Sequence, residues 1–142
     1  MRFLSPEVRP FLERGEILEL VLLDGEGMVL DAEGAHFPPE QLAAFFSPLH
    51  GLLTNIRQGL NIEAFEEISV RTLGPRMRVI LQPFSAQESP YLLIALYPIT
   101  TFYRQVTTDI VRIVKDCIRK LSSHQAAGYD PAAPPKTGRK EP

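Results

Sequence analysis

The sequence predicts an α+β domain in which helices cover both faces of a single sheet. Two segments, 17–23 and 91–97, are apolar almost throughout, as expected of strands that are buried on both sides. Two longer stretches, 40–60 and 101–121, have apolar residues at every third or fourth position, which predicts amphipathic helices. The expected order is helix, strand, strand, helix, three strands and helix, and these elements form a three-layer sandwich.

The composition sets limits on the class of protein. The chain has 142 residues, 44% of them hydrophobic, which is enough for one domain with a substantial core. Its single cysteine, Cys117, excludes a disulfide within the chain, and no apolar run reaches the roughly 18 residues of a membrane span. The net charge of −2 does not indicate a nucleic-acid partner. We therefore expect a cytoplasmic protein with neither nucleic-acid nor membrane partners.

The small net charge conceals an uneven distribution along the chain. Residues 1–67 contain four basic and twelve acidic side chains, whereas residues 68–142 contain eleven basic and five acidic ones. A domain of this kind can present one acidic and one basic surface, which bears on its partners rather than on its fold.

The first helix and the first two strands have local signals. Ser5, Pro6 and Glu7 provide a hydroxyl cap, a proline in the first turn and an early acid, and Pro10 makes this helix short or bent before it ends by Gly15. The first strand is 17–23, and the glycine-rich segment 24–27 before Met28-Val29-Leu30 predicts a hairpin.

The second helix opens after Pro38 and Pro39, and Pro48 is expected to kink it. Its apolar positions are spaced by three and four: Leu42, Phe45, Phe46, Leu49, Leu52, Leu53, Ile56 and Leu60. Another line along the same helix contains small or compact side chains, which would let a second helix approach closely: Ala43, Ser47, His50, Gly51 and Thr54.

Three strands and a helix complete the domain. Residues 67–73 alternate in polarity, Gly74-Pro75 turns the chain, 77–81 returns, and a loop over 85–90 leads to the buried strand 91–97. The last helix has one apolar stripe: Phe102, Val106, Ile110, Ile113, Val114, Cys117 and Leu121. Basic residues outside that stripe form a candidate partner surface, with a merely solvated face as the alternative: Arg104, Arg112, Lys115 and Arg119.

The end of the chain differs in composition from the rest. The segment 122–142 contains four prolines and, after Tyr129, no large apolar side chain. Such a composition is typical of disorder. The sequence therefore divides into a domain of residues 1–121 and a disordered, proline-rich tail of residues 122–142.

No motif brings catalytic groups together. No two of the three histidines have a metal-ligand spacing: His36, His50 and His124. Cys117 falls in an apolar stripe, where a buried structural thiol is the ordinary outcome. The best pairing available to an enzyme is His50 with Glu40 or Glu63, and no third group orients it. We therefore expect no catalytic residues, no metal and no cofactor.

Over about residues 5–121 the chain resembles the roadblock/dynein light-chain family. The resemblance is carried by the strand 17–23 with its acid-glycine turn 24–27 and short return strand, by the long second helix leading to Ile68–Thr72, and by the strand 91–97 that runs directly into the last helix. It implies a profilin-like sandwich with a five-stranded antiparallel sheet of order 2-1-5-4-3. One helix would lie on one face of this sheet and two on the other.

The resemblance also implies partners. In that family the strand at Ile68–Thr72 is an edge that pairs with its own copy, and the second helices pack together across the two-fold axis. The implied interface of a homodimer, or of a roadblock heterodimer, comprises Ala43, Ser47, His50, Gly51, Thr54, Ile68, Ser69, Val70, Arg71 and Thr72.

Prokaryotic roadblock-like proteins are similar to a gliding-motility regulator that binds a Ras-like GTPase and speeds its hydrolysis. The implied function is a non-enzymatic dimeric regulator or scaffold of a small Ras-like GTPase. A small-ligand sensor module of PAS or GAF type is the alternative, with aromatic side chains lining its pocket: Phe45, Phe46, Phe84, Tyr91 and Phe102.

Overall fold

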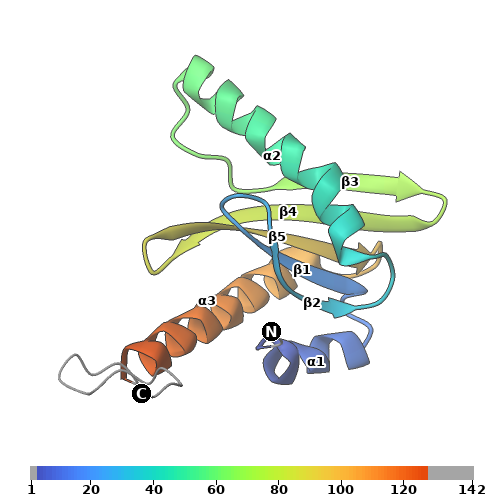
Figure 1. Ribbon diagram of the computed structural model, residues 1–142. Coiled ribbons are helices and arrows are strands. Elements are labelled where there is room, and N and C mark those ends of the chain that lie inside the picture. The colour runs from blue at the N-terminus through green and yellow to red at the C-terminus, as the bar shows by residue number, and fades with distance from the viewer. Residues whose placement is uncertain (1–2, 128–142) are drawn as a thin grey trace.

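A computed structural model of the chain describes residues 3–127 and contains one antiparallel sheet flanked by helices. The strand order is β2-β1-β5-β4-β3, the order that the family resemblance implies (Figure 1). In chain order the elements are α1 (Ser5–Glu13), β1 (Glu19–Asp24), β2 (Val29–Gly34), α2 (Pro39–Leu60), β3 (Ile68–Leu73), β4 (Arg76–Ala86), β5 (Ser89–Pro98) and α3 (Tyr103–Ala127).

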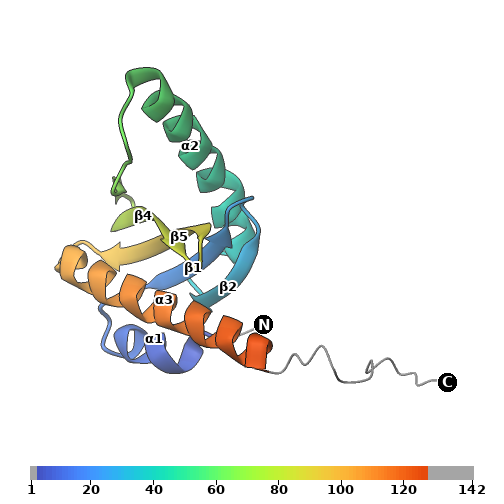
Figure 2. The ribbon, with the colours of Figure 1, turned by 90° about the vertical axis from the view of Figure 1, so that its left-hand side faces the viewer.

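The three predicted layers are present. α2 lies on one face of the sheet, and α1 and α3 lie on the other (Figures 1 and 2). The centre of the sheet is β5, in which residues 92–97 are all buried. Leu93, Ala95 and Tyr97 point toward α1 and α3, whereas Leu92, Ile94 and Leu96 point toward α2. The continuous apolar run of this strand is explained by its having no solvent-facing side.

The connection between β4 and β5 differs from the expected loop over 85–90. Ala86 pairs with Ser89, so only Gln87 and Glu88 form the turn, with φ of 50° and 63°. Two-residue hairpin turns need positive φ and usually contain Gly, Asn or Asp at these positions. Because neither residue is of that type, nothing in the local sequence indicated a tight turn.

The last helix also differs from its expected bounds. α3 begins at Tyr103 and continues to Ala127, past the predicted domain boundary at residue 121. The rest of the predicted tail, residues 128–142, lies outside the described residues. Phe102 precedes α3 and is 89% exposed, so it does not belong to the buried stripe. Val106, Ile110, Val114 and Cys117 do belong to it.

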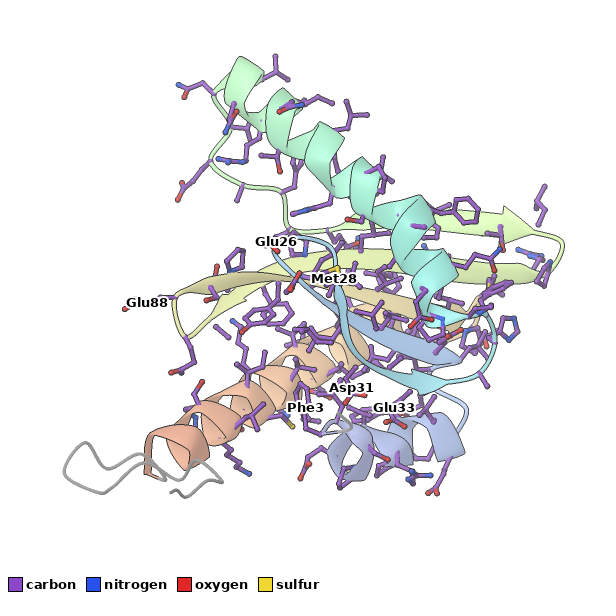
Figure 3. All side chains as sticks on the ribbon, viewed as in Figure 1. Phe3, Glu26, Met28, Asp31, Glu33 and Glu88 are labelled. Carbon is purple, nitrogen blue, oxygen red and sulfur yellow. The ribbon has the colours of Figure 1, made fainter. Side chains whose placement is uncertain are left out.

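The start of α1 is held by an acid of β2 rather than by Ser5. The N-cap position is Leu4, and no side chain within the helix caps it. Instead, Asp31 Oδ2 accepts hydrogen bonds from the amide nitrogens of Phe3, at 2.8 Å, and Leu4, at 2.9 Å. Figure 3 shows Phe3 and Asp31 together between β2 and α1. Asp31 is 5% exposed, so this contact ties α1 to the sheet from inside the protein.

A second buried acid fixes the connection from β2 to α2. Glu19, the polar exception in the first apolar strand, is fully buried on the α2 side of β1. Its Oε1 accepts a hydrogen bond from the Phe37 amide at 2.7 Å, and its Oε2 has no hydrogen-bond partner. Burial raises the pKa of this carboxyl above its ordinary value. Gly34 lies opposite, at φ +93°, where a Cβ would come within 2.6 Å of the Leu18 carbonyl oxygen.

Asp31→Ala is expected to destabilise the fold. The substitution leaves two amides at the start of α1 without their acceptor, which costs about 1–3 kcal/mol. Urea unfolding followed by circular dichroism measures the free energy of unfolding. Asp109→Ala, which removes surface contacts with Arg112 and Gln105, is the control and should cost less than about 1 kcal/mol. Equal losses in the two variants would contradict the anchoring role of Asp31.

Glu19→Gln is expected to change how stability depends on pH. A carboxyl with a raised pKa binds its proton more tightly when folded, so its contribution is fully present below the unfolded pKa of 4.5 and is lost as pH rises through the folded pKa. The glutamine does not titrate, so the variant should gain stability relative to the parent as pH rises above 4.5. Urea unfolding of both proteins at a series of pH values measures this; a difference that is constant with pH contradicts it.

Candidate interaction surface

α2 contacts the sheet through its N-terminal part. Its buried residues are Leu42 and Ala43, each 6% exposed, and Phe46 and Leu49 pack against the same core. The C-terminal half rises away from the sheet, and the segment 61–67 returns to β3 (Figures 1 and 2). This half of the helix therefore has apolar side chains that the core does not use.

Three apolar side chains along α2 form an exposed row: Phe45 is 70% exposed, Leu52 54% and Ile56 38%. With the half-buried Leu49 they have the alternating four- and three-residue spacing of a helix that packs against another helix. We call Phe45, Leu49, Leu52 and Ile56 the α2 ridge. A row of large exposed apolar side chains at this spacing is typical of a protein interface.

The α2 ridge lies on the flank of the helix away from the β1–β2 hairpin. The opposite flank meets that hairpin at Ser47, because a Cβ on Gly27 would come within 2.5 Å of Ser47 Oγ. β2 and β3 are the two edges of the sheet. The ridge therefore faces the β3 side of the molecule.

β3 is an open edge. Among the described residues it pairs only with β4, so its outer row of backbone N–H and C=O groups is free to pair with another strand. Ile68, Val70 and Thr72 are half-buried on the α2 side, and Ser69, Arg71 and Leu73 are exposed on the other. The alternation that the sequence predicted for this strand is confirmed.

The compact line predicted for a second helix lies mostly within the protein. Ala43 is in the core, and Ser47 meets the β1–β2 hairpin. His50 and Thr54 face a cavity on the sheet side of α2, and only Gly51 is exposed. The structure therefore leaves the predicted β3 residues, 68–72, along an open edge, and the exposed apolar side chains of α2 include those of the ridge. The spacing of residues 45, 49, 52 and 56 could be read from the sequence, but the same spacing also fits a side of the helix that is buried in the core.

The cavity under α2 has a volume of about 420 Å³ and lies between the helix, the segment 63–68 and the β4–β5 hairpin. Phe84 and Tyr91, stacked with ring centroids 5.5 Å apart, form part of its wall. His50 and Glu63, one of the two pairings considered from the sequence, both line it, whereas Glu40 lines a separate hollow. Of the aromatic residues considered for a sensor pocket, Phe45 and Phe102 are exposed instead.

The four basic residues predicted as a partner surface on α3 do not lie together at one site. Arg104, Arg112 and Lys115 line a groove of about 730 Å³, and Arg119 does not. Arg112 forms an ion pair with Asp109 at 3.4 Å, and Arg119 forms one with Asp116 at 3.2 Å. The four residues of the predicted partner surface therefore do not share one site: Arg119 lies outside the groove, and Arg112 and Arg119 are already paired with aspartates.

Other chemical groups are buried or isolated. Cys117 is buried, as predicted, and burial raises the pKa of its thiol. Within residues 3–127, no three His, Cys, Asp or Glu side chains are arranged to hold a metal ion. None of the helices in that range is both long and apolar enough to cross a bilayer.

Comparison with known proteins identifies the fold. No protein-family model matches the sequence, and no curated protein matches it either. Among solved structures, Myxococcus xanthus MglB matches with a TM-score of 0.61 over 87% of this chain and 91% of its own, at 11% identity. The gliding protein MglB from Thermus thermophilus matches with a TM-score of 0.61 over 82% and 87%, at 20% identity.

A Roadblock/LC7 domain from Streptomyces avermitilis also matches, with a TM-score of 0.59 over 80% of this chain and 93% of its own, at 15% identity. The chain has the roadblock fold. At these identities the likeness establishes the roadblock fold alone, and the α2 ridge and the β3 edge are described from this chain's own residues.

Proposed function

We propose that the protein is a non-enzymatic, dimeric regulator or scaffold of a small Ras-like GTPase. The observation that carries the proposal is the α2 ridge on the same side of a roadblock fold as the open β3 edge. Both features are unfavourable in an isolated chain, since one exposes large apolar side chains and the other exposes unpaired backbone groups.

A second copy would cover both features at once. β3 would pair with β3 of the partner around a two-fold axis, which is the commonest oligomer geometry. The α2 ridges would then meet, and complete burial of a side chain such as Phe45 or Leu52 contributes about 1.5–3 kcal/mol. Residues 68–72 would form the strand part of this interface, and Gly51 would remain available to it on α2. A roadblock protein of another sequence could take the place of the second copy.

The step from a dimer to a GTPase regulator is supported by the likeness to the MglB structures and by the family resemblance of the sequence. Regulators that reshape the switch loops of a GTPase leave the chemistry to the GTPase. Such a protein requires no catalytic residue of its own.

One observation favours a different function. The cavity of about 420 Å³ beside Phe84 and Tyr91 is of a size that a small ligand could fill, and His50 and Arg57 bring polar groups to it. A sensor of small molecules would retain a ligand there on purification, which mass spectrometry of the native protein would detect.

The chain is expected to form a dimer through the α2 ridge. Light scattering should give twice the mass of one chain, and Phe45→Asp combined with Leu52→Asp should give a monomer with unchanged circular dichroism. Met28→Asp is the matched control, because Met28 is 64% exposed on the β1–β2 hairpin, away from the ridge. A monomeric parent protein, or a folded double variant that remains dimeric, would exclude this interface.

A Ras-like GTPase from the same organism is expected to bind in a nucleotide-dependent manner. The measurement is a pull-down with the GTPase loaded with GDP or a GTP analogue, together with its rate of GTP hydrolysis. The Phe45→Asp/Leu52→Asp variant should lose at least tenfold in affinity if the dimer is the binding unit. If no such GTPase binds in either nucleotide state, the proposal fails.

A further inference from the structure

A group of arginines lies on the face of the sheet opposite α2. Arg71 of β3 and Arg76 and Arg78 of β4 all point to this side, since the residues that alternate with them pack toward α2. Arg104, at the start of α3, lines the groove that borders this side. We call these four residues the arginine face.

The arginine face is electrostatically unfavourable in the free protein. The strand register places Arg71 directly opposite Arg78, and like charges at directly opposed positions of an antiparallel pair repel. Within residues 3–127, none of the four arginines takes part in an ion pair. No direct ion pair therefore offsets this repulsion, whereas a bound anionic group would.

Two of the guanidinium groups are held in place by one aromatic ring. Arg78 lies 4.5 Å and Arg104 5.5 Å from the centroid of the Tyr103 ring. The Tyr103 hydroxyl donates a hydrogen bond to Glu67 Oε2 at 3.0 Å, and Arg78 donates one to Ser69 Oγ at 3.2 Å. These contacts fix the planes of the guanidinium groups before a ligand arrives, which lowers the entropy cost of binding.

The surroundings distinguish among anionic ligands. Large apolar side chains are exposed next to the arginines: Leu73, 88% exposed, pairs with Arg76, and Phe102, 89% exposed, precedes Tyr103. The adjoining groove of about 730 Å³ also contains Glu66 and Glu67. These carboxylates would repel a nucleic acid or an anionic bilayer, whose charges are all negative. A peptide can place its acidic side chains at the arginines and uncharged ones beside Glu66 and Glu67.

We propose that the arginine face binds an acidic, partly apolar peptide segment of a partner protein. Carboxylates of the segment pair with the guanidinium groups of the arginine face, including those of the exposed Arg71 and Arg76, and a large apolar side chain packs on Leu73 or Phe102. The site is on the opposite face of the sheet from α2. It therefore does not involve the α2 ridge or the GTPase, but Arg71 also lies in the β3 segment of the proposed dimer interface. Peptide binding is therefore measured on the monomeric Phe45→Asp/Leu52→Asp variant as well as on the parent protein, which separates this proposal from the proposed self-association.

The test uses a phage library of random twelve-residue peptides selected against the full chain. Enrichment of sequences that contain several Asp or Glu residues and at least one large apolar residue is expected. The best enriched peptide, made synthetically with a fluorophore, should bind at least tenfold more weakly to Arg71→Ala/Arg76→Ala, and its affinity for the parent should fall as salt is raised. Arg14→Ala/Arg119→Ala is the control, since these two arginines lie outside the groove and are already paired with Glu16 and Asp116, and it should change affinity less than twofold.

The alternatives have distinct outcomes. Selection without an acidic bias, or an equal effect of the two double variants, would overturn the proposal. Tighter binding of single-stranded DNA or of phosphatidylserine vesicles than of the peptide would overturn it as well.

A third variant, Arg71→Thr, tests whether weaker binding of the peptide reflects a loss of structure. Arg71→Thr removes one of two opposed charges, so it should raise the urea midpoint of the free protein while it weakens binding of the peptide. A lower midpoint together with weaker binding would mean that the variant acts through the fold, contrary to the proposal.

Discussion

The burial of β1 and β5 on both faces is the constraint on which the rest of the structure depends. Residues 92–97 have no solvent side, so the centre of the sheet requires a helix layer above and below it. α1 and α3 supply one layer and α2 the other. Within the described residues no further helix is left to place over β3, which is consequently half-buried on one face, exposed on the other and unpaired along its outer edge. The candidate surfaces lie beside this strand because the helices are needed at the centre.

The position of α2 follows from two buried contacts before its first turn. Glu19 holds the amide of Phe37, and Gly34 allows the chain to pass close to Leu18. These contacts place Leu42 and Ala43 on the sheet. α2 continues through Pro48 as one helix, and its second half extends beyond the core. A single amphipathic pattern therefore serves two environments: Leu42, Ala43 and Phe46 complete the core, whereas the side of the helix that contains Phe45, Leu52 and Ile56 forms the exposed ridge.

Much of the fold could be predicted from the sequence, because periodicity and long apolar runs are local signals. The order of elements, the doubly buried strands and the alternation of β3 follow from them, whereas the strand order came from the family resemblance. The missed features are non-local or lack a residue signature. Asp31 holds the start of α1 from another strand, and Gln87-Glu88 adopts a turn without glycine. For α2, spacing shows which residues share a side of the helix but not which side meets the sheet, so Ala43 was expected at an interface and lies in the core.

The burial of several acids changes what the charge imbalance between the two halves of the chain implies for the outer surface. Three acids of the first half, Glu19, Asp31 and Glu33, are each no more than 5% exposed. Glu19 supports the loop before α2 and Asp31 the start of α1, and the burial of all three means that they add little to the outer surface. Arg71, Arg76 and Arg104 are exposed, by contrast. A formal net charge of −2 therefore overstates how acidic the surface is to a partner. Four of the eleven basic residues of the second half form the arginine face, next to the strand at which the fold leaves the sheet least covered.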